Sequence, residues 1–209
     1  MITRTISELV DVIVERGKGR TRTLVAIAGP PGVGKSTLSE ALLQLLEARG
    51  LAAAIVPMDG FHHDNDILRS MALLDRKGAP ETFDAAAFVD LVRHLRDNRS
   101  PVNVPLFDRQ ADRVRPDGRT VGTDCRFLLI EGNYLLLDRQ PWTDLGALFD
   151  CTIMVCAPKD VLRERLIRRW LDHGFDRAGA EAKALGNDIP NADLVMSQSL
   201  PADVEYRPE

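Results

Sequence analysis

The sequence has few cysteines, few aromatic residues and no long apolar run. Three cysteines occur in 209 residues, in no metal-ligand spacing, and their odd number suits a reducing compartment. No stretch approaches the roughly 18–20 uninterrupted apolar residues that a membrane-spanning helix requires. Residues 1–10 also lack the apolar core and the cleavage site of a secretory signal. The sequence therefore predicts a cytoplasmic protein without a membrane partner.

An excess of basic charge is also missing. The formal net charge is −4, from 27 Lys and Arg against 31 Asp and Glu. Proteins that bind nucleic acids usually present a basic surface, so we expect no nucleic-acid partner. Lysine is rare among the basic residues, and one of the few lysines lies inside a glycine-rich loop.

The sequence does contain short apolar runs that alternate with amphipathic stretches. The runs predict strands that are buried on both faces, at residues 23–28, 51–56, 127–130 and 151–156. Apolar residues at helical spacing predict helices, at residues 36–49, 84–98, 159–172 and 178–185. This alternation indicates an α/β fold with a central parallel sheet and helices on both faces. No linker or repeat interrupts it, so residues 1–209 are predicted to form a single domain.

One stretch departs from this pattern. Residues 102–107 are typical of a strand, but Pro105 has no N–H to donate, which argues against a fully paired central position. Residues 109–123 are polar and predict a loop or a hairpin. A short strand is expected near residues 202–206.

A glycine-rich loop at residues 29–37 matches the phosphate-loop pattern G-x-x-x-x-G-K-[ST]. Its glycines let backbone N–H groups curl around phosphate oxygens, and the helix that follows adds its positive end. Lys35 is predicted to contact the β- and γ-phosphates of ATP, and the Ser36 hydroxyl to bind Mg²⁺. The predicted nucleotide-binding residues are Gly29, Pro30, Pro31, Gly32, Val33, Gly34, Lys35, Ser36 and Thr37.

Two acidic residues follow predicted strands. Asp59 lies just past the second strand, and ligands of parallel sheets bind beyond the carboxyl ends of the strands. It could therefore accept the proton of a hydroxyl that attacks the γ-phosphate, although its spacing fits a turn or helix-cap aspartate equally well. Glu131 ends the strand at 127–130, and an acid at that place beside a phosphate loop is the Walker B arrangement, predicted to hold Mg²⁺.

Arginines gather on the predicted helix at 159–172. Arg165 and Arg169 stand at i and i+4 and so share a face. They are predicted to contribute cations to the transferring phosphoryl group from a lid at about residues 163–180, with Arg168 as a nucleotide contact. Alternatively, Glu164 and Asp172 neutralise part of this charge as surface pairs.

Taken together, these segments resemble the phosphoribulokinase, uridine kinase and pantothenate kinase superfamily of P-loop kinases. The resemblance runs in ordered blocks from about residue 23 to residue 203. Asp59-Gly-Phe is similar to the catalytic Asp-x-Phe of the family, residues 105–109 to its substrate-contacting P-x-Y-[DS] segment, and residues 165–169 to its lid. Within the superfamily, the segments Pro57–His62 and Arg165–Gly174 resemble bacterial kinases labelled "putative fructose transport system kinase".

The resemblance implies a P-loop NTPase three-layer sandwich with a small helical lid. It implies an ATP-dependent kinase that acts, with Mg²⁺, on a hydroxyl of a small molecule, with Asp59 as base. The substrate contacts expected beside Asp59 are Phe61, His62, Asp84 and Arg109. Phe107 stands where uridine kinases carry a tyrosine, which argues against uridine. Relatives often form dimers, so a homodimer is expected.

The acceptor stays open at this stage. Sugar, nucleoside and pantothenate-like alcohols all fit, with fructose among the sugars. One alternative is a nucleoside monophosphate kinase, but its anionic acceptor would be repelled by the Asp59 carboxylate by roughly 1–4 kcal/mol at 4 Å. Another is a nucleotide-dependent regulatory ATPase. The Asn-Lys-x-Asp segment with which regulatory GTPases read guanine is absent from the sequence.

Overall fold

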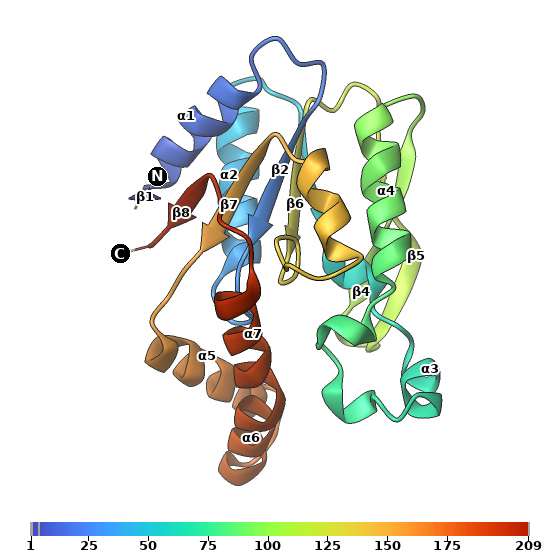
Figure 1. Ribbon diagram of the computed structural model, residues 1–209, viewed down its shortest axis with the longest axis vertical. Coiled ribbons are helices and arrows are strands. Elements are labelled where there is room, and N and C mark those ends of the chain that lie inside the picture. Colours follow the sequence, from blue (N-terminus) through green and yellow to red (C-terminus); the bar gives the residue numbers. More distant parts are fainter. Residues whose placement is uncertain (1, 4, 209) are drawn as a thin grey trace.

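The computed structural model describes residues 2–3 and 5–208 of the chain, and a parallel sheet lies at its centre (Figure 1). The order of the strands is β1-β8-β7-β2-β6-β3, and every pairing in this sheet is parallel. The strands are β1 (Ile2–Thr3), β2 (Thr23–Ala28), β3 (Ala53–Pro57), β6 (Phe127–Gly132), β7 (Cys151–Val155) and β8 (Val204–Tyr206). The predicted parallel α/β sheet is confirmed, with shifts of up to two residues at the ends of its predicted strands.

Strand β2 is central because its side chains can be buried on both faces. All six of its residues are buried, and successive side chains alternate between the two layers of the core. Val25 and Ile27 pack with α1 (Ile6–Arg16) and α2 (Lys35–Ala48) on one face. Leu24 and Ala26 pack with α4 (Ala85–Asp97) on the other. The molecule is therefore the expected three-layer sandwich, with its carboxyl strand ends at one edge.

The polar stretch after α4 forms a hairpin beside the main sheet. Strands β4 (Val102–Asp108) and β5 (Arg113–Val121) pair with each other in an antiparallel, two-stranded sheet. The register is interrupted between Val104 and Leu106, which is the position of Pro105. The hairpin alternative is thus the correct one. The tip of the hairpin lies near the short helix α3 (Asn65–Ser70), where Asn65 donates to Asp112 at 2.7 Å.

Helices from the C-terminal third gather at the bottom of Figure 1. They are α5 (Lys159–Asp172), α6 (Arg177–Lys183), the π-helical turn η5 (Ala184–Asp188) and α7 (Ile189–Gln198). Leu166, Ala180 and Ile189 belong to a small apolar cluster of their own. We call α5, α6 and η5 the lid. Helix α7 did not emerge from the sequence pattern. Among the residues that the structure describes, no helix combines the length and apolar character needed to cross a membrane.

Candidate active site

The loop between β2 and α2 carries the backbone conformation of a phosphate cradle. Gly32 and Gly34 have φ of +77° and +98°, which glycine adopts without the steric cost of a Cβ. A Cβ on Gly32 would also approach the Leu166 side chain to 3.0 Å, so the loop passes close to α5. Helix α2 begins at Lys35, and its N-terminal N–H groups therefore face the loop.

The ammonium group of Lys35 has three partners. Its Nζ donates to the carbonyls of Gly29 and Pro30 at 3.0 Å each, and to Oδ1 of Asn133 at 2.6 Å. Loss of hydration lowers the pKa of Lys35 to about 8, although the nearby charges of Asp59 and Glu131 oppose this shift. Sequence reasoning missed Asn133. Its position two residues past Glu131, at the end of the strand beside β2, was the available signal.

Glu131 and Ser36 form the candidate magnesium site. Glu131 pairs in register with Ile27 of β2, and the Ser36 hydroxyl donates to its Oε1 at 3.2 Å. Its other oxygen, Oε2, is buried without a hydrogen-bond partner among the described residues. Burial raises the pKa of this carboxyl. A hydroxyl, one carboxylate oxygen in need of a partner, and substrate phosphates are typical Mg²⁺ ligands, so the residues fit that ion.

Asp59 lies at the same edge of the sheet. It follows β3 in the 3-10 turn η1 (Met58–Phe61), and its charge affects the pKa of both Lys35 and Glu131. No side chain caps η1, so the cap alternative finds no support. Its carboxylate, 37% exposed, accepts from Nη2 of Arg109 at 3.1 Å. The hairpin turn thus brings Arg109 to Asp59 across 50 residues of sequence.

The other predicted substrate residues have local partners around η1. The Phe61 ring meets the Phe88 ring edge-on, with centroids 5.1 Å apart. His62 lies between the rings of Phe83 and Phe107, and its Nδ1 is 2.9 Å from the carbonyl oxygen of Asp59. Burial lowers the pKa of His62. Asp84 caps α4, accepting from the N–H of Ala87 at 3.0 Å, and its own N–H donates to the Phe61 carbonyl at 2.8 Å.

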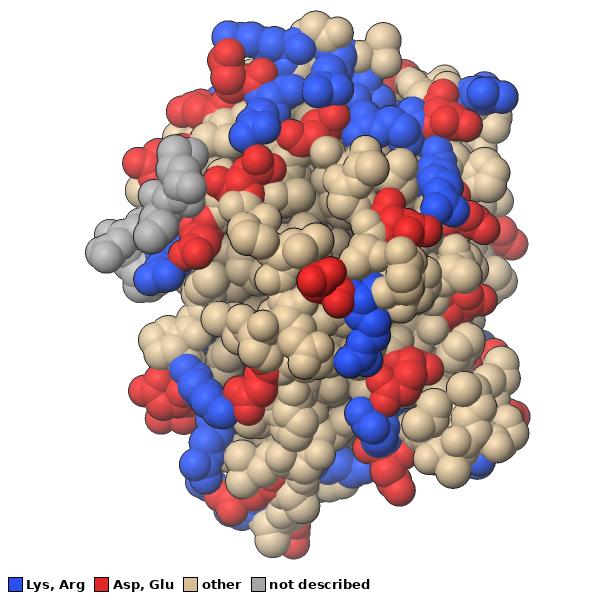
Figure 2. Space-filling model, in the orientation of Figure 1, with Lys and Arg blue, Asp and Glu red and all other residues tan. Residues whose placement is uncertain are grey.

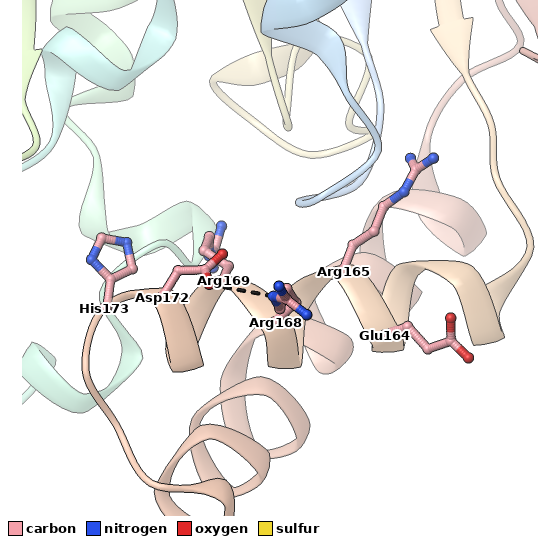
Figure 3. A pocket seen from close by; sticks show the side chains of 6 residues that line it. All are labelled: Glu164, Arg165, Arg168, Arg169, Asp172 and His173. Carbon is pink, nitrogen blue, oxygen red and sulfur yellow. Dashed lines mark hydrogen bonds and ion pairs between the residues drawn. The ribbon is translucent and has the colours of Figure 1, made fainter.

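The lid arginines line a cavity of about 560 Å³ on α5 (Figure 3). Arg165 extends from α5 and donates to the Val33 carbonyl of the phosphate loop at 3.3 Å. Arg168 pairs with Asp172, as the surface-pair alternative supposed. The other residues at this cavity are Glu164, Arg169 and His173.

The counter-ion of Arg169 was not foreseen. Its Nη2 lies 2.9 Å from Oδ1 of Asp188, a buried residue at the end of η5. The indole N–H of Trp170 donates to Oδ2 of the same carboxylate at 2.6 Å. Asp188 lies 19 residues from Arg169 in sequence, beyond the reach of a helical-spacing argument.

A second cavity, of about 790 Å³, adjoins the lid cavity through Arg165. Its wall comes from the ends of β7 and β8, the start of α5 and the segment after α7, and it includes Met154, Cys156, Pro158, Met196 and Leu200. Figure 2 shows a largely uncharged area over α7 and the segment that leads to β8. The site thus has a polar half at the phosphate loop and an apolar half beside it. Cys156, expected in the core, is only partly buried here.

The chain is similar to known proteins over most of its length. The model of the "Phosphoribulokinase / Uridine kinase family" matches residues 24–202. A crystal structure described as "putative fructose transport system kinase" from Silicibacter sp. TM1040 is 46% identical and has a TM-score of 0.93, covering 98% of this chain and 100% of that one.

Two curated relatives were also found. "Uncharacterized protein YggC" of Escherichia coli is 38% identical over 88% of this chain and 76% of its own length. "Putative uridine kinase C227.14" of Schizosaccharomyces pombe is 34% identical over 94% of this chain and 88% of its own length.

Proposed function

We propose a function on the premise that this chain belongs to the phosphoribulokinase/uridine kinase family. It is an ATP-dependent P-loop kinase, a phosphotransferase with an alcohol group as acceptor. The proposal concerns the chemistry within that class. The chain phosphorylates a hydroxyl of a small metabolite, with Asp59 as general base. The observation that carries this is the position of the Asp59 carboxylate, partly exposed and within electrostatic reach of Lys35 and Glu131.

The nucleotide is held by residues 29–37. Their N–H groups surround its phosphates, Lys35 contacts the β- and γ-phosphates, and Ser36 and Glu131 hold Mg²⁺. Bound Mg-ATP supplies the phosphoryl group and neutralises part of its charge. The largely apolar cavity beside Arg165 receives the adenine base, because a flat, weakly polar ring suits such a wall.

Asp59 orients the acceptor hydroxyl and takes its proton as the oxygen attacks the γ-phosphorus. A new O–P bond forms while the bond to the β-phosphate oxygen breaks. Arg165 and Arg169 stabilise the charge on the transferring group from the lid, with Arg168 as a further nucleotide contact. Phe61, His62, Asp84 and Arg109 surround the acceptor.

A neutral alcohol is the acceptor that Asp59 favours, since an acceptor phosphate would meet a carboxylate. The name of the Silicibacter relative makes fructose the first sugar to test. Nucleosides and pantothenate-like alcohols follow. A homodimer in the cytoplasm is the proposed state of the protein, and sedimentation of the purified chain tests its assembly.

The experiment is a coupled ADP-release screen over hydroxyl-bearing metabolites, read against the background without acceptor. We expect one or more neutral alcohols to raise ADP release in the native chain, and Asp59→Asn to abolish the increase. An increase with nucleoside monophosphates alone would assign a nucleoside monophosphate kinase instead. Hydrolysis that no acceptor changes would assign a regulatory ATPase.

A further inference from the structure

Lys35 in the phosphate loop and Arg169 in the lid lie at the two ends of one continuous line of contacts. The line starts at Asn133, whose Oδ1 accepts from Lys35 at 2.6 Å. The next residue, Tyr134, is fully buried, and its hydroxyl donates to the carbonyl of Gly78 at 2.5 Å. The end of β6 is thereby connected to the segment 76–82, which precedes α4.

The line continues from that segment into the lid. The carbonyl of Lys77, next to Gly78, accepts from Nδ2 of Asn187 at 2.8 Å. Lys77 is itself anchored, because its Nζ donates to Asn65 at 2.7 Å and to Asp112 at 2.8 Å. Asn187 therefore contacts a backbone that is held in place.

The last step lies within the π-helical turn η5. Asn187 is followed by Asp188, the counter-ion of Arg169 and the acceptor of the Trp170 indole N–H. Turns of this kind are rare and often occur at functional sites. Here the turn directs two successive side chains to different partners, one outside the lid and one within it.

Three pairs of consecutive residues thus build the whole line, 133–134, 77–78 and 187–188. In each pair one residue contacts the previous pair or Lys35, and the other contacts the next pair or Arg169. Since Lys35 uses three donors on protein oxygens, a phosphate that binds it must compete with Gly29, Pro30 or Asn133. Any movement of Asn133 strains the buried hydroxyl contact of its neighbour Tyr134.

We infer that Asn133, Tyr134 and Asn187 are positioning residues that couple nucleotide binding at Lys35 to the placement of Arg169 in the lid. The inference rests on the proposed function in one respect only, that Lys35 binds the nucleotide phosphates. It adds residues and a direction of communication which that function does not require.

Hydrogen exchange with mass spectrometry tests the line. The ligand is Mg²⁺ with a non-hydrolysable ATP analogue, so that no acceptor is needed. In the native chain we expect the analogue to slow exchange at residues 29–37 and also at 76–82 and 184–189. Tyr134→Phe removes one hydroxyl and keeps the ring that packs on Phe83 and Trp142. It should keep the protection at 29–37 and lose at least about half of that at 184–189.

Tyr206→Phe is the matched control, because it also removes a partly buried phenol hydroxyl but lies at the end of β8. It should behave as the native chain does. Unchanged protection of 184–189 in Tyr134→Phe would overturn the inference. Absence of protection at 29–37 in the native chain would count against the proposed function instead.

Asn187→Ala provides a second, independent cut. It interrupts the line beyond Lys77, so protection should persist at 76–82 and fall at 184–189. This variant decides the matter if Tyr134→Phe does not fold. Equal protection of both segments in Asn187→Ala would show that the lid responds by another route, and the inference would be wrong.

Discussion

The hydroxyl of Ser36 donates to Oε1 of Glu131 at 3.2 Å and joins the first turn of α2 to the end of β6. The second carboxylate oxygen is buried without a partner among the described residues. A single carboxylate thus has one oxygen engaged and one in need of a cation or a proton. This asymmetry leads to two predictions about the same residue.

Glu131→Gln should weaken Mg²⁺ binding, because an amide replaces an anionic oxygen. We expect the Mg²⁺ concentration that half-saturates nucleotide binding to rise by about 10–100-fold. Magnesium titrations of nucleotide binding measure this. Glu47→Gln, at the far end of α2, is the control and should leave the midpoint unchanged.

The same substitution should stabilise the metal-free fold. Burial raises the pKa of Glu131 above its ordinary 4.5 in the folded state. The folded chain therefore binds more protons than the unfolded chain above that pH, and its free energy of unfolding falls as pH rises. We expect a higher Tm for Glu131→Gln than for the native chain at pH 7 without Mg²⁺. A lower Tm would mean that the ionised carboxylate is well satisfied.

Nucleotide binding should take up a proton at alkaline pH. Lys35 has a pKa of about 8 in the free enzyme, and bound phosphates favour its charged form. Above pH 8 the affinity for the nucleotide should therefore fall, by up to about tenfold per pH unit. Calorimetry at pH 8.5 in two buffers of different ionisation enthalpy measures the uptake. Lys35→Met should abolish it, and an uptake that persists in this variant would assign the proton to another group.

Lys35 also affects stability with a definite sign. Its folded pKa lies below the model value of 10.5, so between about pH 8 and 10.5 the unfolded chain binds more protons. The free energy of unfolding contributed by this residue rises with pH across that window. Urea unfolding of the native chain and of Lys35→Met at pH 8 and pH 10 should show this difference.

Asp59→Asn should lower kcat by about 10²–10⁴-fold, because the amide cannot accept the hydroxyl proton. Nucleotide affinity should change little. Asp64→Asn is the control, since it alters an exposed aspartate five residues away at the start of α3. An unchanged kcat in Asp59→Asn would remove this residue from the role of base.

Gly60 should be required at its position next to Asp59. An added Cβ would overlap the carbonyl of Pro105 in the hairpin. Gly60→Ala should therefore destabilise the fold by about 1–3 kcal/mol, the usual range for overpacking, and should displace Asp59 from Arg109. Gly146→Ala has no atom within 4 Å of its new Cβ and serves as control. Denaturant unfolding compares the two, and equal stabilities would contradict the prediction.

The sequence predicted what local pattern encodes. The phosphate loop is nine consecutive residues, and the central strands are continuous apolar runs, so each signal lies within one segment. Asp59 and Glu131 were found because each follows such a run. The pairing of Arg109 with Asp59 and the contacts of Asn133 and Asp188 join segments 19 to 98 residues apart. Their partners are set by tertiary packing, which spacing along one segment does not record. Helix α7 was missed because its short apolar face follows the π-helical turn without a break.

The turn at 184–188 holds one residue more than an α-helical turn of the same height. Each α-helical residue advances the side-chain direction by about 100°. Deleting a single residue from this turn would merge α6 and α7 into one regular helix and rotate everything that follows by about that angle. Sequence length at this one point therefore sets which side chain faces Arg169, and relatives with a shorter turn must hold that arginine by a different residue or leave it free.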